Sequence, residues 1–302
     1  MKHVPQAIEA DLKHARALEL WTLFWQLSIV AVMFFAMGSS QAMKSAWVED
    51  VLGMVPATVF LVALHFEQKA PTEKFPFGFA RVNSLAFLIA SAALIFMGLY
   101  LIYDGGMKLV RMEHPTIGAA PLLGPDVWMG WVMLAALAYS TVPPIILGRL
   151  KQPVAKRLQD KVLHTDALMQ KADWMTGVAG GVGILGVGFG WWWADSAAAV
   201  LIAVDIVNDG RRALTIATAE LIDGAPRELG RNAVADEARS LRQGLQSKFG
   251  ADRVRLRESG RFILAEVDGG KPPAQSDPEA LWSGDQERRW RLADVTATVA
   301  RR

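Results

Sequence analysis

Long apolar stretches separated by short polar segments dominate the first two thirds of the chain. A bilayer core requires about 20 mostly apolar residues per crossing helix. Six stretches approach that length, although the fifth is interrupted by charges and the sixth is short. They occupy roughly residues 17–38, 41–64, 84–107, 127–148, 163–189 and 194–208. The pattern therefore predicts an α-helical membrane protein with six transmembrane helices.

Basic residues are concentrated in alternate connections between these stretches. Because such residues favour the cytoplasmic side of a membrane, their distribution predicts the orientation. Basic residues occur before the first stretch, between the second and third, between the fourth and fifth, and after the sixth, for example Lys13, Lys74, Lys156 and Arg211. We therefore expect a multi-pass protein of the bacterial inner membrane with both termini cytoplasmic. The charged segment 1–16 reads as a cytoplasmic lead-in helix and not as a signal peptide.

The character of the chain changes after Asp223. Residues 228–250 have helical periodicity ending in a glycine, "RVRLRES" and "RFILAEVDG" read as two strands, "DPEALWSGDQER" reads as a short helix, and "LADVTATVA" alternates like a closing strand. The expected organisation is a cytoplasmic N-terminal segment (1–16), a six-span transmembrane domain (17–210), and a linker with a small cytoplasmic αββαβ, ferredoxin-like domain (211–302).

Composition supports this assignment and excludes several functions. Of the 302 residues 52% are hydrophobic, and the formal net charge of +2 offers no basic surface for nucleic acid. The chain has no cysteine, so it can form neither disulfides nor thiolate metal sites. No Ser/His/Asp constellation or phosphate-binding glycine loop indicates an enzyme or a bound cofactor.

Acidic residues inside the predicted spans are the strongest functional signal. Polar side chains at bilayer depth are costly, so they usually face a cavity or a partner. Glu49 and Asp50 lie in the second span, and Asp173 lies near the middle of the fifth. Carboxylates from two helices can thus meet at similar depth and bind a cation. The alternative is that Lys44 or Lys171 neutralises these carboxylates in structural ion pairs.

Two further residues of the fifth span are weaker candidate metal ligands. Met169 lies one turn before Asp173, but a methionine there is more often a packing residue than a soft ligand. His164 lies at the cytoplasmic end of the span, where an interfacial or gating role is the alternative to metal binding. The glycine-rich segment 177–190 is expected to serve close helix packing.

Several segments together resemble the cation diffusion facilitator family. The loop "EKFPFGFARVNSL" is similar to that family's Tyr-Gly-x-x-Arg loop, and "WWWADSAAAVLIA" is similar to its Trp-x-Asp start of span six. "ELIDGAP" resembles the Leu-x-Asp boundary before the family's cytoplasmic domain. The resemblance covers nearly the whole chain. It implies a homodimer that exports a divalent cation in exchange for protons.

The transport site departs from the pattern of that family. The family's second span carries Asp/His-x-x-x-Asp and its fifth carries His/Asp-x-x-x-Asp, whereas this chain has Gly53 four residues after Glu49 and Met169 four residues before Asp173. Only Glu49 and Asp173 match by position, with Asp50 as a neighbouring replacement. A carboxylate-dominated site favours oxygen-preferring Mn²⁺ or Fe²⁺, with Zn²⁺ and Co²⁺ as further possible substrates. A scaffold or regulatory protein with little transport, and a carrier of another solute, are the alternatives.

Overall fold

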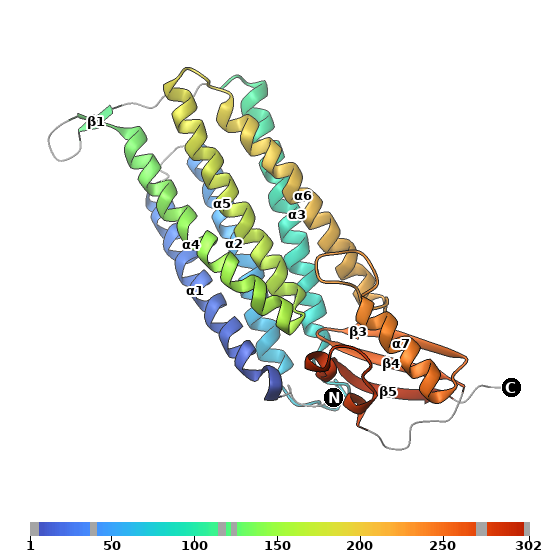
Figure 1. Cartoon of the computed structure of the whole chain (residues 1–302). Helices are drawn as coiled ribbons and strands as arrows, with labels where there is room; N and C mark the ends of the chain where they lie inside the picture. The colour runs from blue at the N-terminus through green and yellow to red at the C-terminus, as the bar shows by residue number, and fades with distance from the viewer. Residues whose placement is uncertain (1–5, 37–40, 114–118, 122–125, 270–276, 299–302) are drawn as a thin grey trace.

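Six long helices form a bundle with a small sheet at one end (Figure 1). The computed structural model describes residues 6–36, 41–113, 119–121, 126–269 and 277–298. The helices are α1 (Gln6–Ala36), α2 (Gln41–Glu67), α3 (Arg81–Val110), α4 (Met129–Leu158), α5 (Lys161–Gly188) and α6 (Ala194–Leu221). A short antiparallel pair, β1 (Ala119–Pro121) and β2 (Asp126–Trp128), precedes α4.

Each predicted apolar stretch falls almost entirely within one of these helices, but most of the helices are longer than the stretches. Helix α1 begins at Gln6, and α6 continues past the expected boundary at residue 210 to Leu221. Among the described residues, two stretches combine sufficient length and hydropathy with few charges, Trp47–Glu67 and Arg81–Val110. The other four long helices do not meet this combined test within the described residues.

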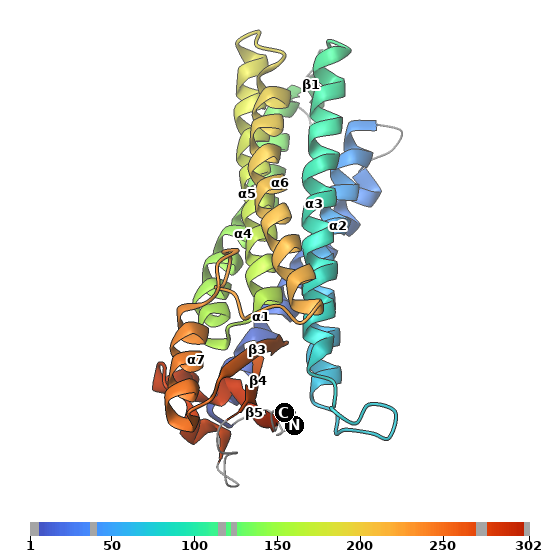
Figure 2. The same cartoon turned by 90° about the vertical axis from the view of Figure 1, so that its right-hand side faces the viewer.

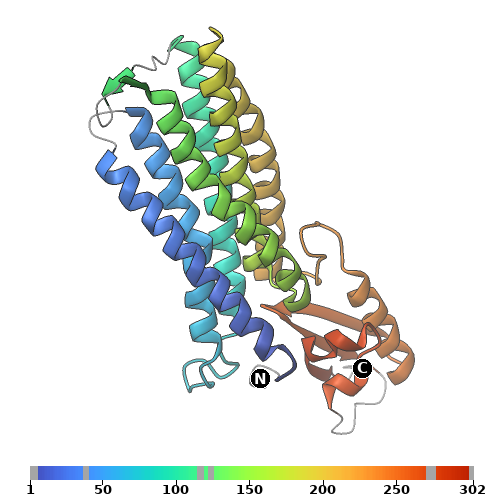
Figure 3. The same ribbon diagram turned by 60° about the vertical axis from the view of Figure 1, so that its left-hand side comes forward.

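Helices α3 and α6 approach each other closely because glycines lie on both facing surfaces. A Cβ atom at Gly98 of α3 would lie 2.7 Å from the Val207 side chain, and one at Gly210 of α6 would lie 2.7 Å from Ile95. A larger residue at either position would push the helices apart. Helices α4 and α5 form a second pair, and α2 packs against both α1 and α5. Figure 3 shows α1 and α4 side by side along one flank of the bundle.

Within the described residues, the C-terminal unit contains helix α7, two short 3₁₀ turns and a three-stranded sheet. Helix α7 (Asp236–Phe249) ends at Gly250, whose left-handed φ of +59° caps it. Strands β3 (Arg253–Ser259) and β4 (Phe262–Asp268) form an antiparallel hairpin, and β5 (Leu292–Thr298) pairs in parallel with β4. The positions of these strands agree with the sequence prediction.

Two parts of this unit differ from the prediction. Residues 228–235 do not belong to α7: Gly230 has a φ of +74° and Ala235 is extended, so the helix cannot start before Asp236. The expected helix at 277–288 is instead two short 3₁₀ turns, η1 (Pro278–Leu281) and η2 (Gln286–Arg291). Asp277 caps the first as expected, but the extended Trp282 separates the turns.

The C-terminal unit packs directly against the end of the bundle where α1 begins (Figure 2). Phe262 of β4 and Trp290 of η2 meet edge to face, with ring centroids 6.0 Å apart. Both rings belong to the same buried cluster as Leu12 of α1, Phe60 of α2 and Leu163 of α5. One buried apolar cluster therefore extends across the contact between the bundle and the C-terminal unit.

The bundle has an inverted distribution of polar and apolar side chains. Trp21, Phe24 and Leu27 of α1 are each more than half exposed, whereas Glu19 is fully buried. Large exposed apolar side chains also occur on the other long helices, for example Val62, Phe96, Ile146, Val182 and Leu201. In a water-soluble bundle the apolar face points inward, so this arrangement suits an apolar solvent.

Candidate metal centre

The predicted site lies where α1, α2 and α5 meet. Asp173 is partly buried near the middle of α5, and its Oδ2 accepts a hydrogen bond of 3.3 Å from Nε2 of Gln26 on α1. Gly53 of α2 completes the junction, because a Cβ atom there would lie 2.6 Å from Gln26 Nε2 and 3.4 Å from Asp173 Oδ2. One carboxylate and one amide thus converge beside a residue that has no side chain.

Glu49 and Asp50 lie on α2 within four residues of Gly53 and are partly buried. Helix α2 packs against α5, and both carboxylates are near enough to Asp173 to act on it electrostatically. Within the described ranges, however, no group of three or more His, Asp or Glu side chains is arranged to hold a metal ion. The structure therefore brings the predicted carboxylates into one region without gathering them around a single point.

Lys171 does not neutralise Asp173. Its Nζ donates to Asp205 Oδ2 at 2.7 Å and to Asp209 Oδ2 at 3.3 Å, both on α6. This pairing removes one of the two structural ion pairs that the sequence allowed. The other involves Lys44, whose side chain lies outside the described residues.

Met169 occupies an apolar environment. It is fully buried in a cluster with Leu94 and Met97 of α3 and with Ala203 and Ile206 of α6. Asp173 instead faces Gln26 of α1. The structure therefore favours the packing interpretation of Met169.

His164 lies in a small pocket near the C-terminal unit. The pocket is lined by Asp209 and Arg212 of α6 and by Gly230 of the following loop. A Cβ atom at Gly230 would lie 2.7 Å from His164 Nε2, so this loop closes directly over the imidazole. His164 is nine residues before Asp173, about 13 Å along the helix axis, and the two residues are not part of one site.

A buried ion cluster between α1, α4 and α5 was not foreseen from the sequence. Lys151 Nζ donates to Glu19 Oε2 at 2.9 Å and also forms a short contact with Asp166 Oδ2, and all three side chains are fully buried. The available signal was the spacing of Glu19, Thr22 and Gln26 at i, i+3 and i+7, which aligns them on one face of α1. In the sequence, Lys151 cannot be distinguished from the other basic residues expected at the cytoplasmic membrane surface.

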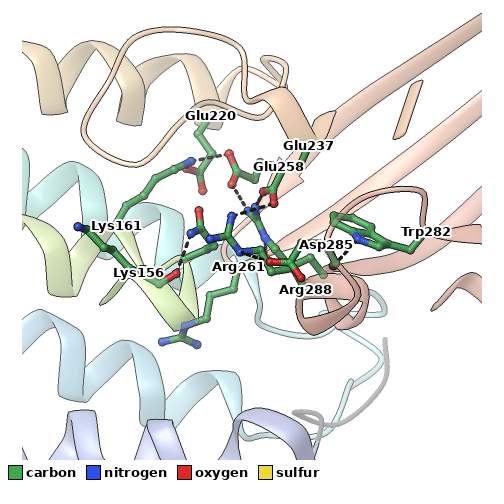
Figure 4. A network of polar contacts seen from close by, with 11 residues as sticks. Lys156, Lys161, Glu220, Glu237, Glu258, Arg261, Trp282, Asp285 and Arg288 are labelled. Atoms are coloured by element: carbon green, nitrogen blue, oxygen red, sulfur yellow. Dashed lines mark hydrogen bonds and ion pairs between the residues drawn. The ribbon is translucent and has the colours of Figure 1, made fainter. Parts of the chain in front are cut away.

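A second buried network joins the helix ends to the C-terminal hairpin (Figure 4). Arg261 forms ion pairs with Asp160 and with Glu67 at the end of α2. Lys161 of α5 contacts Glu220 of α6 and Glu258 of β3, and Glu258 also accepts from Arg291. Burial raises the pKa of Glu258 to about 7, while the charge of Lys161 opposes that shift.

Two of the quoted motifs meet at the rim of this network. Arg81, from "FPFGFAR", forms an ion pair with Asp223, from "ELIDGAP", and both side chains are about half exposed. Arg257 of β3 donates to the same carboxylate at 3.2 Å. Asp223 therefore links the start of α3 to the C-terminal sheet through two guanidinium groups.

Comparison with known families identifies the bundle. The family model for the cation efflux transmembrane domain matches residues 20–222, which is two thirds of the chain. The chain belongs to the cation efflux, or cation diffusion facilitator, family. This is a family of transporters and not of enzymes, as the sequence predicted.

Curated members of the cation efflux family resemble the chain at low identity. The manganese efflux system protein MneS of Bacillus subtilis is 24% identical over 63% of this chain and 63% of its own length. A cadmium, cobalt and zinc/H⁺–K⁺ antiporter of Bacillus velezensis is 27% identical over 56% of this chain and 50% of its own. The zinc transporter ZitB of Yersinia pseudotuberculosis is 24% identical over 58% and 52%.

These matches span between half and two thirds of the cation efflux relatives, and the relatives differ in the metal that they are named for. The relatives therefore do not agree on one ion. For a member of this family, Gly53 and Met169 are departures at two positions where a charged or imidazole ligand is expected. Gln26 of α1 lies beside Gly53, and Met169 is packed among apolar side chains.

Proposed function

We propose that this protein exports a divalent cation from the cytoplasm by proton antiport, through a site between α2 and α5. Asp173 is the central ligand, with Glu49 second and Asp50 third. The observation that carries the proposal is the position of Asp173 near the middle of α5, directed toward buried polar groups of α1 and not paired with Lys171.

The surroundings of Asp173 explain how protons and a cation can exchange there. Glu49, Asp50 and Asp173 carry like charges in a poorly hydrated region, so their repulsion is relieved by binding either protons or a divalent cation. Facing the cytoplasm, the carboxylates bind the cation and release protons. Facing the outside, they bind protons and release the cation. Because one helix set can rock against another, access alternates without moving the site itself.

The proposed topology is six membrane crossings with both termini in the cytoplasm. Support comes from the basic connections and from the apolar side chains exposed around the bundle. The start of α1 and the C-terminal sheet lie at the same end of the bundle, as this topology requires (Figure 1). We also propose a homodimer held by the C-terminal unit without metal, since residues 224–302 contain neither His nor Cys.

Proteoliposome flux tests the proposal. We expect the wild-type protein to move Mn²⁺, Fe²⁺, Co²⁺ or Zn²⁺, with a rate that depends on the proton gradient. Asp173→Asn removes the charge at nearly constant shape and should abolish flux while the protein stays folded. Asp205→Asn is the matched control, since Asp205 is half exposed on α6 and pairs with Lys171. Absent flux in the wild type would favour the scaffold alternative, and normal flux in Asp173→Asn would move the site elsewhere.

A further inference from the structure

Helix α1 presents a buried polar residue to the metal centre. Gln26 is only 5% exposed, although Phe24 and Leu27 beside it in the sequence are more than half exposed. Its Nε2 donates to Asp173, but its Oε1 is buried and has no hydrogen-bond partner among the residues that the structure describes. An amide oxygen in that position is costly unless it acquires a partner, so the site contains an oxygen donor that is still available.

The space that Gln26 occupies exists because residue 53 is glycine. A Cβ atom at Gly53 would approach Gln26 Nε2 to 2.6 Å, which is too close for the present arrangement. The same Cβ would lie 3.4 Å from Asp173 Oδ2, so a side chain at residue 53 would point at the same carboxylate. A side chain at residue 53 would therefore require the flexible end of Gln26 to move away from its present place beside Asp173.

The chemistry of an amide suits this role. An amide carbonyl is a neutral oxygen donor, and carboxylate and carbonyl oxygens together are the ligands preferred by Mn²⁺ and similar hard cations. Rotation of the amide exchanges its NH₂ and oxygen ends, whose assignment follows from the surrounding hydrogen bonds. The NH₂ end of Gln26 faces Asp173, and rotation of the amide would direct the oxygen end to the same point.

We propose that Gln26 is a direct ligand of the transported cation and takes the place of the carboxylate absent at residue 53. This inference rests on the proposed transport function and names its substrate class, a divalent cation that prefers oxygen ligands, such as Mn²⁺. The neutral amide gives the site one negative charge fewer than a carboxylate at residue 53 would give. The α1 helix thereby becomes part of the transport site.

Binding of Mn²⁺ and Zn²⁺ to the purified full-length protein in detergent tests this role. Loss of an outer partner already changes metal affinity 10–100-fold, so loss of a ligand in Gln26→Leu should weaken Mn²⁺ binding at least about tenfold. The loss should be smaller for Zn²⁺, which needs fewer oxygen ligands. Thr22→Val on α1 is the matched control, because Thr22 is also buried and donates only to the Leu18 carbonyl oxygen. It should leave both affinities unchanged.

Gln26→Glu separates a ligand from a hydrogen-bond donor. If Gln26 is a ligand, the glutamate oxygen replaces the amide oxygen and Mn²⁺ binding is retained or strengthened. If Gln26 only donates to Asp173, the added charge repels that carboxylate and Gln26→Glu loses as much binding as Gln26→Leu, which overturns the proposal. Unchanged Mn²⁺ binding in Gln26→Leu also overturns it.

An exchange of positions provides a rescue that does not depend on either single variant folding well. Gly53→Asp alone should impair binding because its side chain displaces the Gln26 amide from its place beside Asp173. Gly53→Asp combined with Gln26→Ala should recover it, and a double variant no better than Gly53→Asp alone would contradict the exchange. Asp173→Asn distinguishes the two levels of failure. If it abolishes binding while the Gln26 variants behave like wild type, only this inference fails, and if the wild type binds no cation, the proposed function fails as well.

Discussion

Removal of the Arg261 guanidinium should release the C-terminal hairpin from the helix ends. Arg261 is 1% exposed, donates from Nε to Asp160 at 2.7 Å, and forms an ion pair with Glu67. Arg261→Met leaves both buried carboxylates without their cation, and breaking such a cluster costs about 3–5 kcal/mol. Since 1.4 kcal/mol corresponds to a factor of ten, local opening of the hairpin should become roughly 100- to 4,000-fold more frequent.

Hydrogen exchange of the β3 and β4 amides in detergent measures this opening. Arg255→Met is the matched control, since Arg255 lies on the same hairpin and contacts Glu266 and Asp268, but is half exposed. Exposed pairs contribute about 0–1 kcal/mol, so exchange in this control should rise less than about tenfold. Equal exchange rates in the two variants would refute the claim that the buried cluster holds the hairpin in place.

Further changes test other parts of the molecule. Glu258 has a folded pKa of about 7 against an ordinary 4.5, so stability falls as pH rises across that interval. Hydrogen exchange should therefore show a more firmly docked hairpin at pH 6 than at pH 8. Glu258→Gln should remove most of that difference. Arg81→Lys keeps the charge but loses the guanidinium fork that holds Asp223, so proteoliposome flux should fall several-fold. Because the half-exposed Arg81–Asp223 pair contributes only about 0–1 kcal/mol, thermal stability should change little. Undiminished flux would show that Arg81 acts only as a membrane anchor. Met169→Leu conserves volume in an apolar cluster and should lower the free energy of unfolding by less than about 1.5 kcal/mol. Binding titrations should show an unchanged affinity for Cd²⁺. A selective loss of Cd²⁺ binding would instead make Met169 a ligand.

The helices and strands follow from local properties of the sequence. The lengths of the apolar stretches predict the positions of the six long helices. Gly250 ends α7 through its left-handed backbone, and Asp277 caps the start of η1. The same local reasoning fails at residues 228–235, where the periodicity is helical but Gly230 has a φ of +74° and its loop lies over His164. The sequence alone indicates Asp173 as a candidate ligand, because a carboxylate in a membrane span is costly in any arrangement of the helices.

The partners of those residues depend on how the helices are arranged. Sequence spacing cannot show that Lys171 pairs with α6, that Lys151 joins Glu19 to Asp166, or that Met169 faces an apolar cluster. Each pairing is set by the rotation and depth of one helix against another, and packing of whole surfaces fixes both. Gln26 shows the difference most directly: the sequence records a missing side chain at residue 53, and only the close approach of α1 to α2 and α5 shows which group fills its place.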